Sequence, residues 1–152
     1  MSPSETAVKP EKRIAVVVIN YRTYQLTVDC VNSLEHEIDP ERDVVIIVDN
    51  ASGDDSPDRI ETTLAERHWN SWATLVRSPV NGGFSAGNNR GVESVSAQAY
   101  LLLNSDTIAK PGAIKALWQA LAASPEIGIA GARLEYPDGT MQTSRFRRLT
   151  PL

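Results

Sequence analysis

The sequence predicts an α/β domain with a mostly parallel sheet and helices on both faces. Three features predict it: continuous runs of β-branched residues, apolar residues at helical spacing between those runs, and an alternation of the two along most of the 152 residues. Strands that are joined by helices run parallel through right-handed crossovers. Ligands of such sheets bind beyond the carboxyl ends of the strands.

The first half of the chain contains two strand-helix units. Residues 14–19 and 44–48 are uninterrupted apolar runs, as in strands that are buried on both faces. Between them, apolar residues recur at helical spacing behind Thr23, which we expect to be an N-cap. Ser56 as a cap and Pro57 at the first helical position predict the start of a second helix.

The second half continues the alternation and ends in a hairpin. We expect strands over residues 73–77, 99–103 and 127–132, a helix over residues 84–95, and another helix from Pro111 that Pro125 stops. Residues 133–136 and 140–146 flank Pro137-Asp138-Gly139, a strong turn sequence, and are predicted to pair as a hairpin.

Composition limits the classes of function. Residues 1–12 are polar and are expected to form a flexible leader, which leaves residues 13–152 as one domain. A net charge of -4 argues against a nucleic-acid-binding protein, which normally carries a basic face. Cys30 is the single cysteine, so no intrachain disulfide can form and the reducing cytosol is the expected compartment. The apolar runs are too short to span a bilayer.

Polar loops follow the predicted strands. Asp49 comes directly after a strand, where its carboxylate can accept hydrogen bonds from a ribose hydroxyl or a base N–H. Residues 81–91 combine glycines with amide side chains. Their glycine spacing resembles that of a Walker A loop, but Asn88 and Asn89 stand where lysine and serine or threonine are required, so a phosphate-binding loop of that type is rejected.

A single carboxylate follows the strand at residues 99–103. Asp106 is placed where it can reach a hard cation that bridges a diphosphate, since Mg²⁺ commonly takes one or two protein carboxylates and completes its shell with phosphate and water. A nicotinamide-dependent dehydrogenase is disfavoured, because residues 20–23 after the first strand carry no glycine fingerprint.

Four of these stretches, in this order and spacing, resemble the motifs of the family 2 glycosyltransferases. They are Val16-Val17-Val18-Ile19-Asn20-Tyr21, residues 48–54, residues 81–91 and Leu103-Asn104-Ser105-Asp106. The resemblance implies a GT-A fold and transfer of a sugar from a nucleotide diphosphate sugar, usually with Mg²⁺ or Mn²⁺. Asn104 replaces the first residue of the common Asp-x-Asp motif, which is similar to rhamnosyltransferase-like members and favours dTDP-rhamnose over a UDP-sugar.

The resemblance also implies roles for individual residues. Asn20 and Tyr21 would line the nucleoside pocket, Asp49 would contact the base, Asn81 and Gly82 would belong to the nucleotide-binding loop, Asn88 and Asn89 would lie by the base and ribose, and Asp106 would bind the metal. No catalytic residue is assigned. Family members usually continue further, through an acceptor site and an acidic motif with the catalytic base, so we expect this chain to be the donor-binding part.

The expected acceptor is a saccharide or a lipid-linked saccharide of cell-surface polysaccharide synthesis. The setting implied is the cytoplasm, with peripheral association at the inner face of the membrane. A second hypothesis stays open, in which the chain is a non-catalytic module that binds a nucleotide sugar or a partner. Sugar nucleotide titration followed by a transfer assay separates the two.

Overall fold

The computed structural model describes residues 11–143 of the chain. The chain divides into two units, Met1–Pro111 and Gly112–Leu152, which are described separately.

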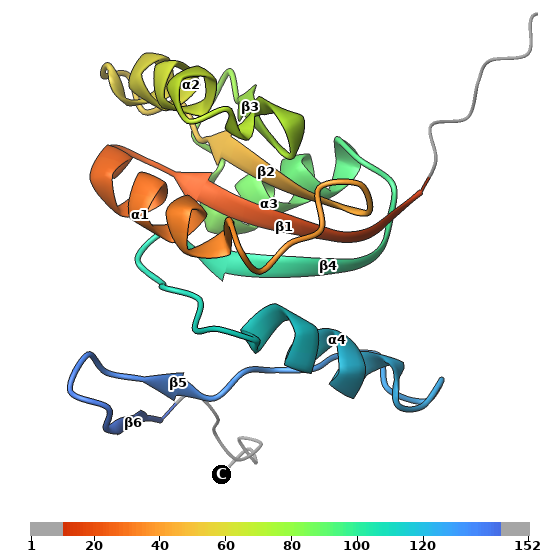
Figure 1. Ribbon diagram of the computed structural model, residues 1–152. Coiled ribbons are helices and arrows are strands. Elements are labelled where there is room, and N and C mark those ends of the chain that lie inside the picture. Colours follow the sequence, from red (N-terminus) through yellow and green to blue (C-terminus); the bar gives the residue numbers. More distant parts are fainter. Residues whose placement is uncertain (1–10, 144–152) are drawn as a thin grey trace, which may run out of the picture. The chain divides into compact units, whose positions relative to one another are not determined.

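The first unit is built on a four-stranded parallel sheet with the order β3-β2-β1-β4 (Figure 1). Its strands are β1 (Lys12–Asn20), β2 (Asp43–Asp49), β3 (Ala73–Arg77) and β4 (Ala97–Asn104). In the register, Asn20 lies opposite Asp49, and Ile19 lies opposite Asn104. The strand ends are therefore level, and the loops that follow them start from one edge of the sheet.

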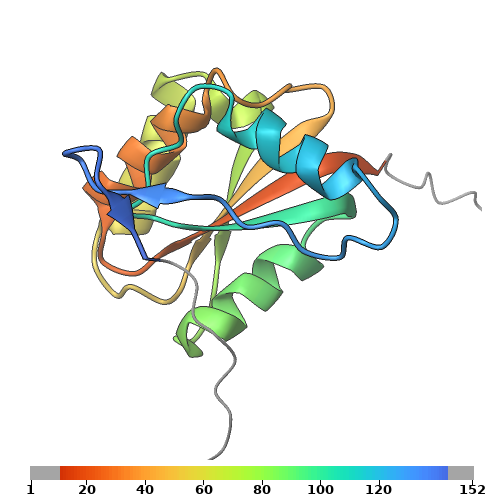
Figure 2. The ribbon, with the colours of Figure 1, turned by 90° about the horizontal axis from the view of Figure 1, so that it is seen from below.

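Helices cover both faces of this sheet, as the sequence predicts. Helices α1 (Tyr24–Leu34) and α2 (Ser56–Glu66) lie on one face, and α3 (Gly83–Glu93) lies on the other (Figure 2). A short 3₁₀ helix, η1 (Trp69–Ser71), precedes β3 and was not predicted. The α/β architecture with a mostly parallel sheet is thus confirmed.

The core has two layers because the central strands alternate their side chains between the faces. Val17 and Val48 point toward α3 and are fully buried there. On the opposite face, Ile47 packs with Val31 of α1 and Ile60 of α2. Strands with two buried faces need an apolar residue at every position, which is why these segments read as uninterrupted runs in the sequence.

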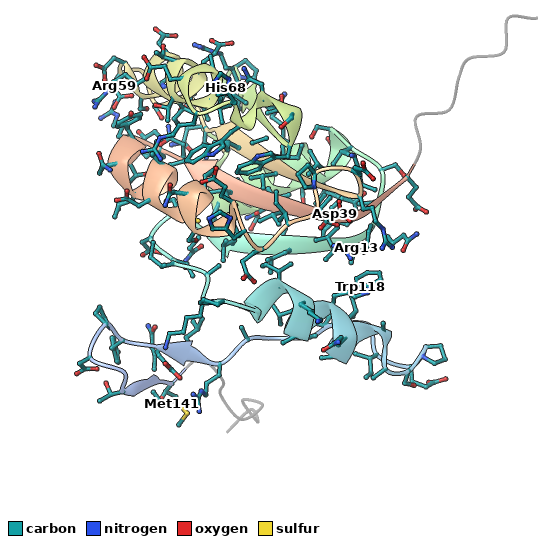
Figure 3. The ribbon with its side chains drawn as sticks, in the orientation of Figure 1. Arg13, Asp39, Arg59, His68, Trp118 and Met141 are labelled. Carbon is teal, nitrogen blue, oxygen red and sulfur yellow. The ribbon has the colours of Figure 1, made fainter. Side chains whose placement is uncertain are left out.

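An ion pair closes the amino end of the sheet. Arg13 Nε donates to Asp43 Oδ1 at 2.9 Å, and its Nη2 lies 2.5 Å from Oδ2 of the same carboxylate. The backbone N–H of Asp39 also donates to the buried Asp43 side chain. Figure 3 shows Arg13 and Asp39 at this end of the sheet. The buried Asp43 carboxylate is therefore paired at this end of the sheet.

Of the two predicted helix caps, one is confirmed and one is wrong. Thr23 is the N-cap residue of α1, as predicted, although its hydroxyl donates to Asn20 Oδ1 and makes no capping bond to the helix. Ser56 is the first residue of α2 and not its cap, because Asp55 holds that place and Asp54 Oδ1 accepts the Ser56 N–H at 3.0 Å.

The second unit contains α4 (Ala113–Ala122), β5 (Leu134–Glu135) and β6 (Met141–Gln142). The two strands pair antiparallel around the predicted turn, in which Gly139 has φ 84°. This confirms the hairpin over the described residues; positions 144–146 lie outside them. The strand expected over residues 127–132 is wrong: within the part that the structure describes, this segment has no paired neighbour, and a strand requires one.

Strand β1 begins at Lys12, the last residue of the expected leader. Most of the expected leader, residues 1–10, lies outside the described range. No described helix is both long and apolar enough to cross a bilayer.

Candidate functional site

Four loops at the carboxyl edge of the sheet line one open cavity of about 420 Å³. The residues around it come from the ends of β1, β2 and β4, the first turn of α1 and the loop that opens α3. They are Ile19, Tyr21, Thr23, Leu26, Asn50, Asn81, Gly83, Phe84, Asn104, Ser105 and Asp106. The cavity therefore lies where a parallel sheet is expected to bind its ligand.

Asn20 lies below the cavity and holds the surrounding loops together. Its side chain is fully buried. Its Nδ2 lies within hydrogen-bond distance of Asp49 Oδ1 at 2.7 Å, Ser56 Oγ at 2.9 Å and Ser52 Oγ at 3.1 Å. Its Oδ1 accepts from Thr27 Oγ1 at 3.1 Å. Both ends of the amide are thus occupied by protein groups, and Asn20 does not line the cavity.

Asp49 belongs to the same buried network. It is 4% exposed, and its carboxylate accepts hydrogen bonds from Asn20 Nδ2, from Ser52 Oγ at 2.5 Å and from the Ser52 N–H at 3.2 Å. Three donors satisfy a carboxylate well. The side chain supports the loop after β2, and it is not among the residues that line the cavity. A direct contact of Asp49 with a base stays a prediction.

Two residues with left-handed backbones stand beside residues of the cavity wall. Arg22 has φ 59° and follows Tyr21, and Ala51 has φ 56° and follows Asn50. Such conformations cost about 1–3 kcal/mol each in non-glycine residues and persist only where the surroundings fix them. For Arg22 the fixing groups belong to Ser52, whose Oγ accepts the Arg22 N–H and whose carbonyl accepts from Arg22 Nε.

Asn50 and Asn81 form an amide pair on the β2–β3 side of the cavity. Asn50 Nδ2 donates to Asn81 Oδ1 at 2.9 Å and to the Gly83 carbonyl at 3.1 Å. The Gly83 N–H donates to the same Asn81 Oδ1 at 2.9 Å. Asn50 was not among the predicted site residues, although its place directly after Asp49 at a strand end was the available signal.

Helix α3 lies close to the sheet because it has glycines on its inner side. A Cβ at Gly87 would meet Ile19 Cδ1 at 3.1 Å, and one at Gly91 would overlap Val17. Asn88 is buried in this helix, with Nδ2 donating to the Phe84 carbonyl at 3.0 Å, and Asn89 is exposed.

Of the residues predicted in this loop and helix, only Asn81 lines the cavity. Asn88 and Asn89 do not, and Gly82 adjoins the lining residue Gly83. Their expected contacts with base and ribose stay predictions.

The loop after β4 forms the opposite side of the cavity. Its residues Asn104, Ser105 and Asp106 all line the wall, and Ser105 Oγ lies 3.4 Å from Thr23 Oγ1. Below this loop, Cys30 Sγ donates to the Asn104 carbonyl at 3.6 Å. Burial, reinforced by the negative charge of Asp106, raises the pKa of Cys30 from 9.0 to about 12, so the thiol stays protonated.

The oxygen atoms of this loop suit a hard cation whose remaining ligands are phosphate oxygens and water. No cluster of three or more histidine, cysteine or acidic side chains occurs among residues 11–143, so the described part holds no complete metal cage. Asp106 offers one exposed carboxylate to the cavity, with amide and hydroxyl oxygens from Asn104 and Ser105 beside it. These oxygen ligands match Mg²⁺ or Mn²⁺ bound together with phosphate oxygens and water, rather than zinc in a cysteine or histidine site.

The sequence of the chain matches the family described as Glycosyl transferase family 2 over residues 15–151. No curated protein matches it significantly.

Solved structures with a similar fold include a mannosyltransferase and S. aureus TarS. The mannosyltransferase PcManGT from Pyrobaculum calidifontis, in complex with GDP-Man and Mn²⁺, has a TM-score of 0.63 and 22% identity, over 74% of this chain and 33% of that one. S. aureus TarS 1-349 has a TM-score of 0.57 and 20% identity, over 68% and 30% of the two chains, and a complex with UDP-GlcNAc matches similarly. This chain thus spans about a third of the length of these structures, and at such identities the likeness shows the GT-A type of fold.

Proposed function

The chain belongs to glycosyl transferase family 2, and on this premise we propose that its cavity binds a nucleotide diphosphate sugar for transfer to a saccharide or lipid-linked acceptor. The observation that carries the proposal is the convergence of four strand-end loops on one cavity, with a carboxylate on one side and amides on the other. A ligand with a charged diphosphate and a polar base requires both kinds of surface.

We assign the diphosphate to the β4 side of the cavity. Asp106, with Asn104 and Ser105 beside it, would hold Mg²⁺ or Mn²⁺ there. When bound, the cation would offset negative charge on the departing nucleoside diphosphate. The Mn²⁺ complex of the mannosyltransferase PcManGT supports a divalent cation in this kind of fold.

We assign the nucleoside to the side formed by the ends of β1, β2 and β3. Tyr21 offers an exposed ring on which a base can stack, and Asn81 offers a polar amide. Asn20 and Asp49 would act from below, by fixing the loops that carry these groups. Asn88, Asn89 and Gly82 would contribute to the ligand from α3 and its loop, as the family resemblance implies.

The finer identity of the donor is also a proposal. Asn104 in place of the first aspartate of Asp-x-Asp favours dTDP-rhamnose, with UDP-sugars as the alternative. GDP-Man and UDP-GlcNAc are the nucleotide sugars in the solved complexes of the structural neighbours. The proposed setting is cell-surface polysaccharide synthesis at the cytoplasmic face of a membrane. We assign no residue of the cavity to deprotonation of the acceptor.

Isothermal calorimetry with dTDP-rhamnose, UDP-glucose, UDP-GlcNAc and GDP-mannose, each with and without Mn²⁺, tests the binding step. Release of nucleoside diphosphate in the presence of a panel of saccharide acceptors tests transfer. Metal-dependent binding of one donor is the expected result. Binding without any transfer would favour the non-catalytic module. If the chain binds none of the four donors, the proposal is refuted.

A further inference from the structure

The orientation of the two amides on the β2–β3 side of the cavity is fixed by the backbone of Gly83. A backbone N–H can only donate, so the Asn81 atom that it contacts at 2.9 Å must be the acceptor Oδ1. A backbone carbonyl can only accept, so the Asn50 atom at 3.1 Å from it must be Nδ2. The bond from Asn50 Nδ2 to Asn81 Oδ1 at 2.9 Å agrees with both assignments.

These bonds decide which amide atoms are left for a ligand. The Asn50 Nδ2 and Asn81 Oδ1 atoms are occupied by each other and by Gly83. What the pair retains is the Asn50 Oδ1 acceptor and the Asn81 Nδ2 donor, and both residues line the cavity. An acceptor and a donor from neighbouring amides match an N–H next to a C=O, as on the edge of a pyrimidine imide.

The position of the pair in the sheet indicates which part of the ligand it meets. Asp106 follows β4, whereas Asn50 and Asn81 follow β2 and β3 at the other side of the sheet order. Three strand spacings separate β4 from β3, which is about 14 Å at the usual distance between neighbouring strands. If the diphosphate lies by Asp106, as the proposed function requires, the amide pair faces the distal, nucleobase end of the donor.

We propose that Asn50 is a specificity-determining and positioning residue: its Oδ1 accepts from N3–H of a uracil or thymine base, and its Nδ2 holds Asn81 so that Asn81 Nδ2 donates to the adjacent base carbonyl. This inference rests on the proposed function, since it needs a nucleotide in the cavity. It explains why Asn50 is only 3% exposed and yet lies on the cavity wall. It also accounts for the left-handed backbone of Ala51, which changes the direction of the chain directly after Asn50.

The test compares the binding of UDP and N3-methyl-UDP by calorimetry in the presence of Mn²⁺. Methylation removes the N3–H donor and leaves the rest of the nucleotide unchanged. The unsubstituted chain is expected to bind N3-methyl-UDP about tenfold more weakly than UDP, the size of one hydrogen bond. In Asn50→Ala, the ratio of the two dissociation constants should fall to near one, and UDP itself should bind about tenfold more weakly or worse.

A second variant separates the two amides without disturbing their mutual bonds. Asn81→Asp keeps an oxygen that accepts from Gly83 and Asn50 but replaces the Nδ2 donor. It should bind UDP at least tenfold more weakly while keeping the discrimination against N3-methyl-UDP. Asn70→Asp is the matched control, because Asn70 is exposed in η1 and is not part of the cavity wall; it should behave as the unsubstituted chain.

The outcomes are distinguishable. If the unsubstituted chain binds no nucleoside diphosphate or nucleotide sugar, both the proposed function and this inference are wrong. If UDP binds but Asn50→Ala retains the discrimination against N3-methyl-UDP, or the unsubstituted chain shows none, only this inference is overturned. A uniform loss of affinity with an unchanged ratio in Asn50→Ala would mean that Asn50 acts on the fold alone, which also overturns it.

Discussion

Replacing Gly91 by alanine should destabilise the domain, although alanine is the better helix former. The added Cβ would overlap Val17 Cγ1 and would lie 3.1 Å from Val17 Cγ2 and 3.2 Å from Val48 Cγ2. Both valines are fully buried in the centre of the sheet and are stiff at χ1, so neither can turn away. Overpacking of this kind costs about 1–3 kcal/mol, and with three close contacts we expect the upper half of that range.

Helix propensity offsets part of this cost. Glycine is about 1 kcal/mol less favourable than alanine within a helix, so the net loss should be about 1–2 kcal/mol. For a slope near 2 kcal/mol per molar urea, the midpoint of urea unfolding should fall by about 0.5–1 M. Circular dichroism of the purified chain during a urea titration measures this shift.

Gly87→Ala is the matched control, one turn earlier in the same helix. Its Cβ would meet the flexible Cδ1 end of Ile19 at 3.1 Å, and would lie 3.5 Å from Ile19 Cγ2 and 3.7 Å from Asn50 Cγ, both ordinary contact distances. This variant should stay within about 0.5 kcal/mol of the unsubstituted chain, since the gain in propensity roughly balances a small adjustment. A Gly91→Ala variant as stable as Gly87→Ala would refute the packing argument.

Three further predictions concern the site and its support. Asp106→Asn should weaken donor binding in Mg²⁺ or Mn²⁺ by about 10- to 100-fold without changing metal-free binding, because one charged ligand is lost; calorimetry that shows unaltered metal dependence would remove Asp106 from the site. Asp49→Ala should lower nucleoside affinity with or without metal, and equal loss of pyrophosphate affinity would count against the nucleoside role. The loss of its hydrogen bonds to Asn20 and Ser52 should also lower the free energy of unfolding by roughly 1.5–3 kcal/mol. An unchanged urea midpoint would count against this structural role. Because burial raises the pKa of Cys30 to about 12, folding stability should decline between about pH 9 and pH 12, where the unfolded thiol ionises and the native thiol does not; Cys30→Ala should show a shallower decline in urea titrations at each pH, and identical slopes would contradict the buried, protonated thiol.

The central strands of the first unit could be predicted because strands that are buried on both faces consist of apolar residues. Residues 14–19 and 44–48 are β-branched runs with one alanine and no polar interruption, which is typical of a strand with two covered faces. The run at residues 127–132 is also apolar, but two of its six residues are glycines, which are depleted in strands, and it has no paired neighbour in the described structure. Pairing also depends on segments distant in sequence, so an apolar run alone does not establish a strand.

The location of the cavity at the strand ends could also be predicted, but the state of the side chains around it could not. Tyr21, Asn81 and Asp106 line the cavity, as expected for residues after strand ends. Asn20 and Asp49 follow the same pattern and yet turn inward, because Ser52 and Ser56 supply partners there. A polar residue at a strand end can bond to a ligand or to the next loop, and that choice depends on the three-dimensional position of two serines.

The pairing of β1 with both β2 and β4 has a consequence for the order in which the pocket assembles. The β1–β2 pairing closes a short loop, whereas the contact between Thr23 and Ser105 joins residues 82 positions apart. Closing a longer loop costs more entropy, and pairing of distant segments slows folding. We therefore expect Tyr21 and Asn50 to reach their places early, and Asp106 to arrive only when β4 docks. During refolding, a fluorescent nucleotide should bind first without responding to Mn²⁺ and should gain its metal dependence in a later, slower phase.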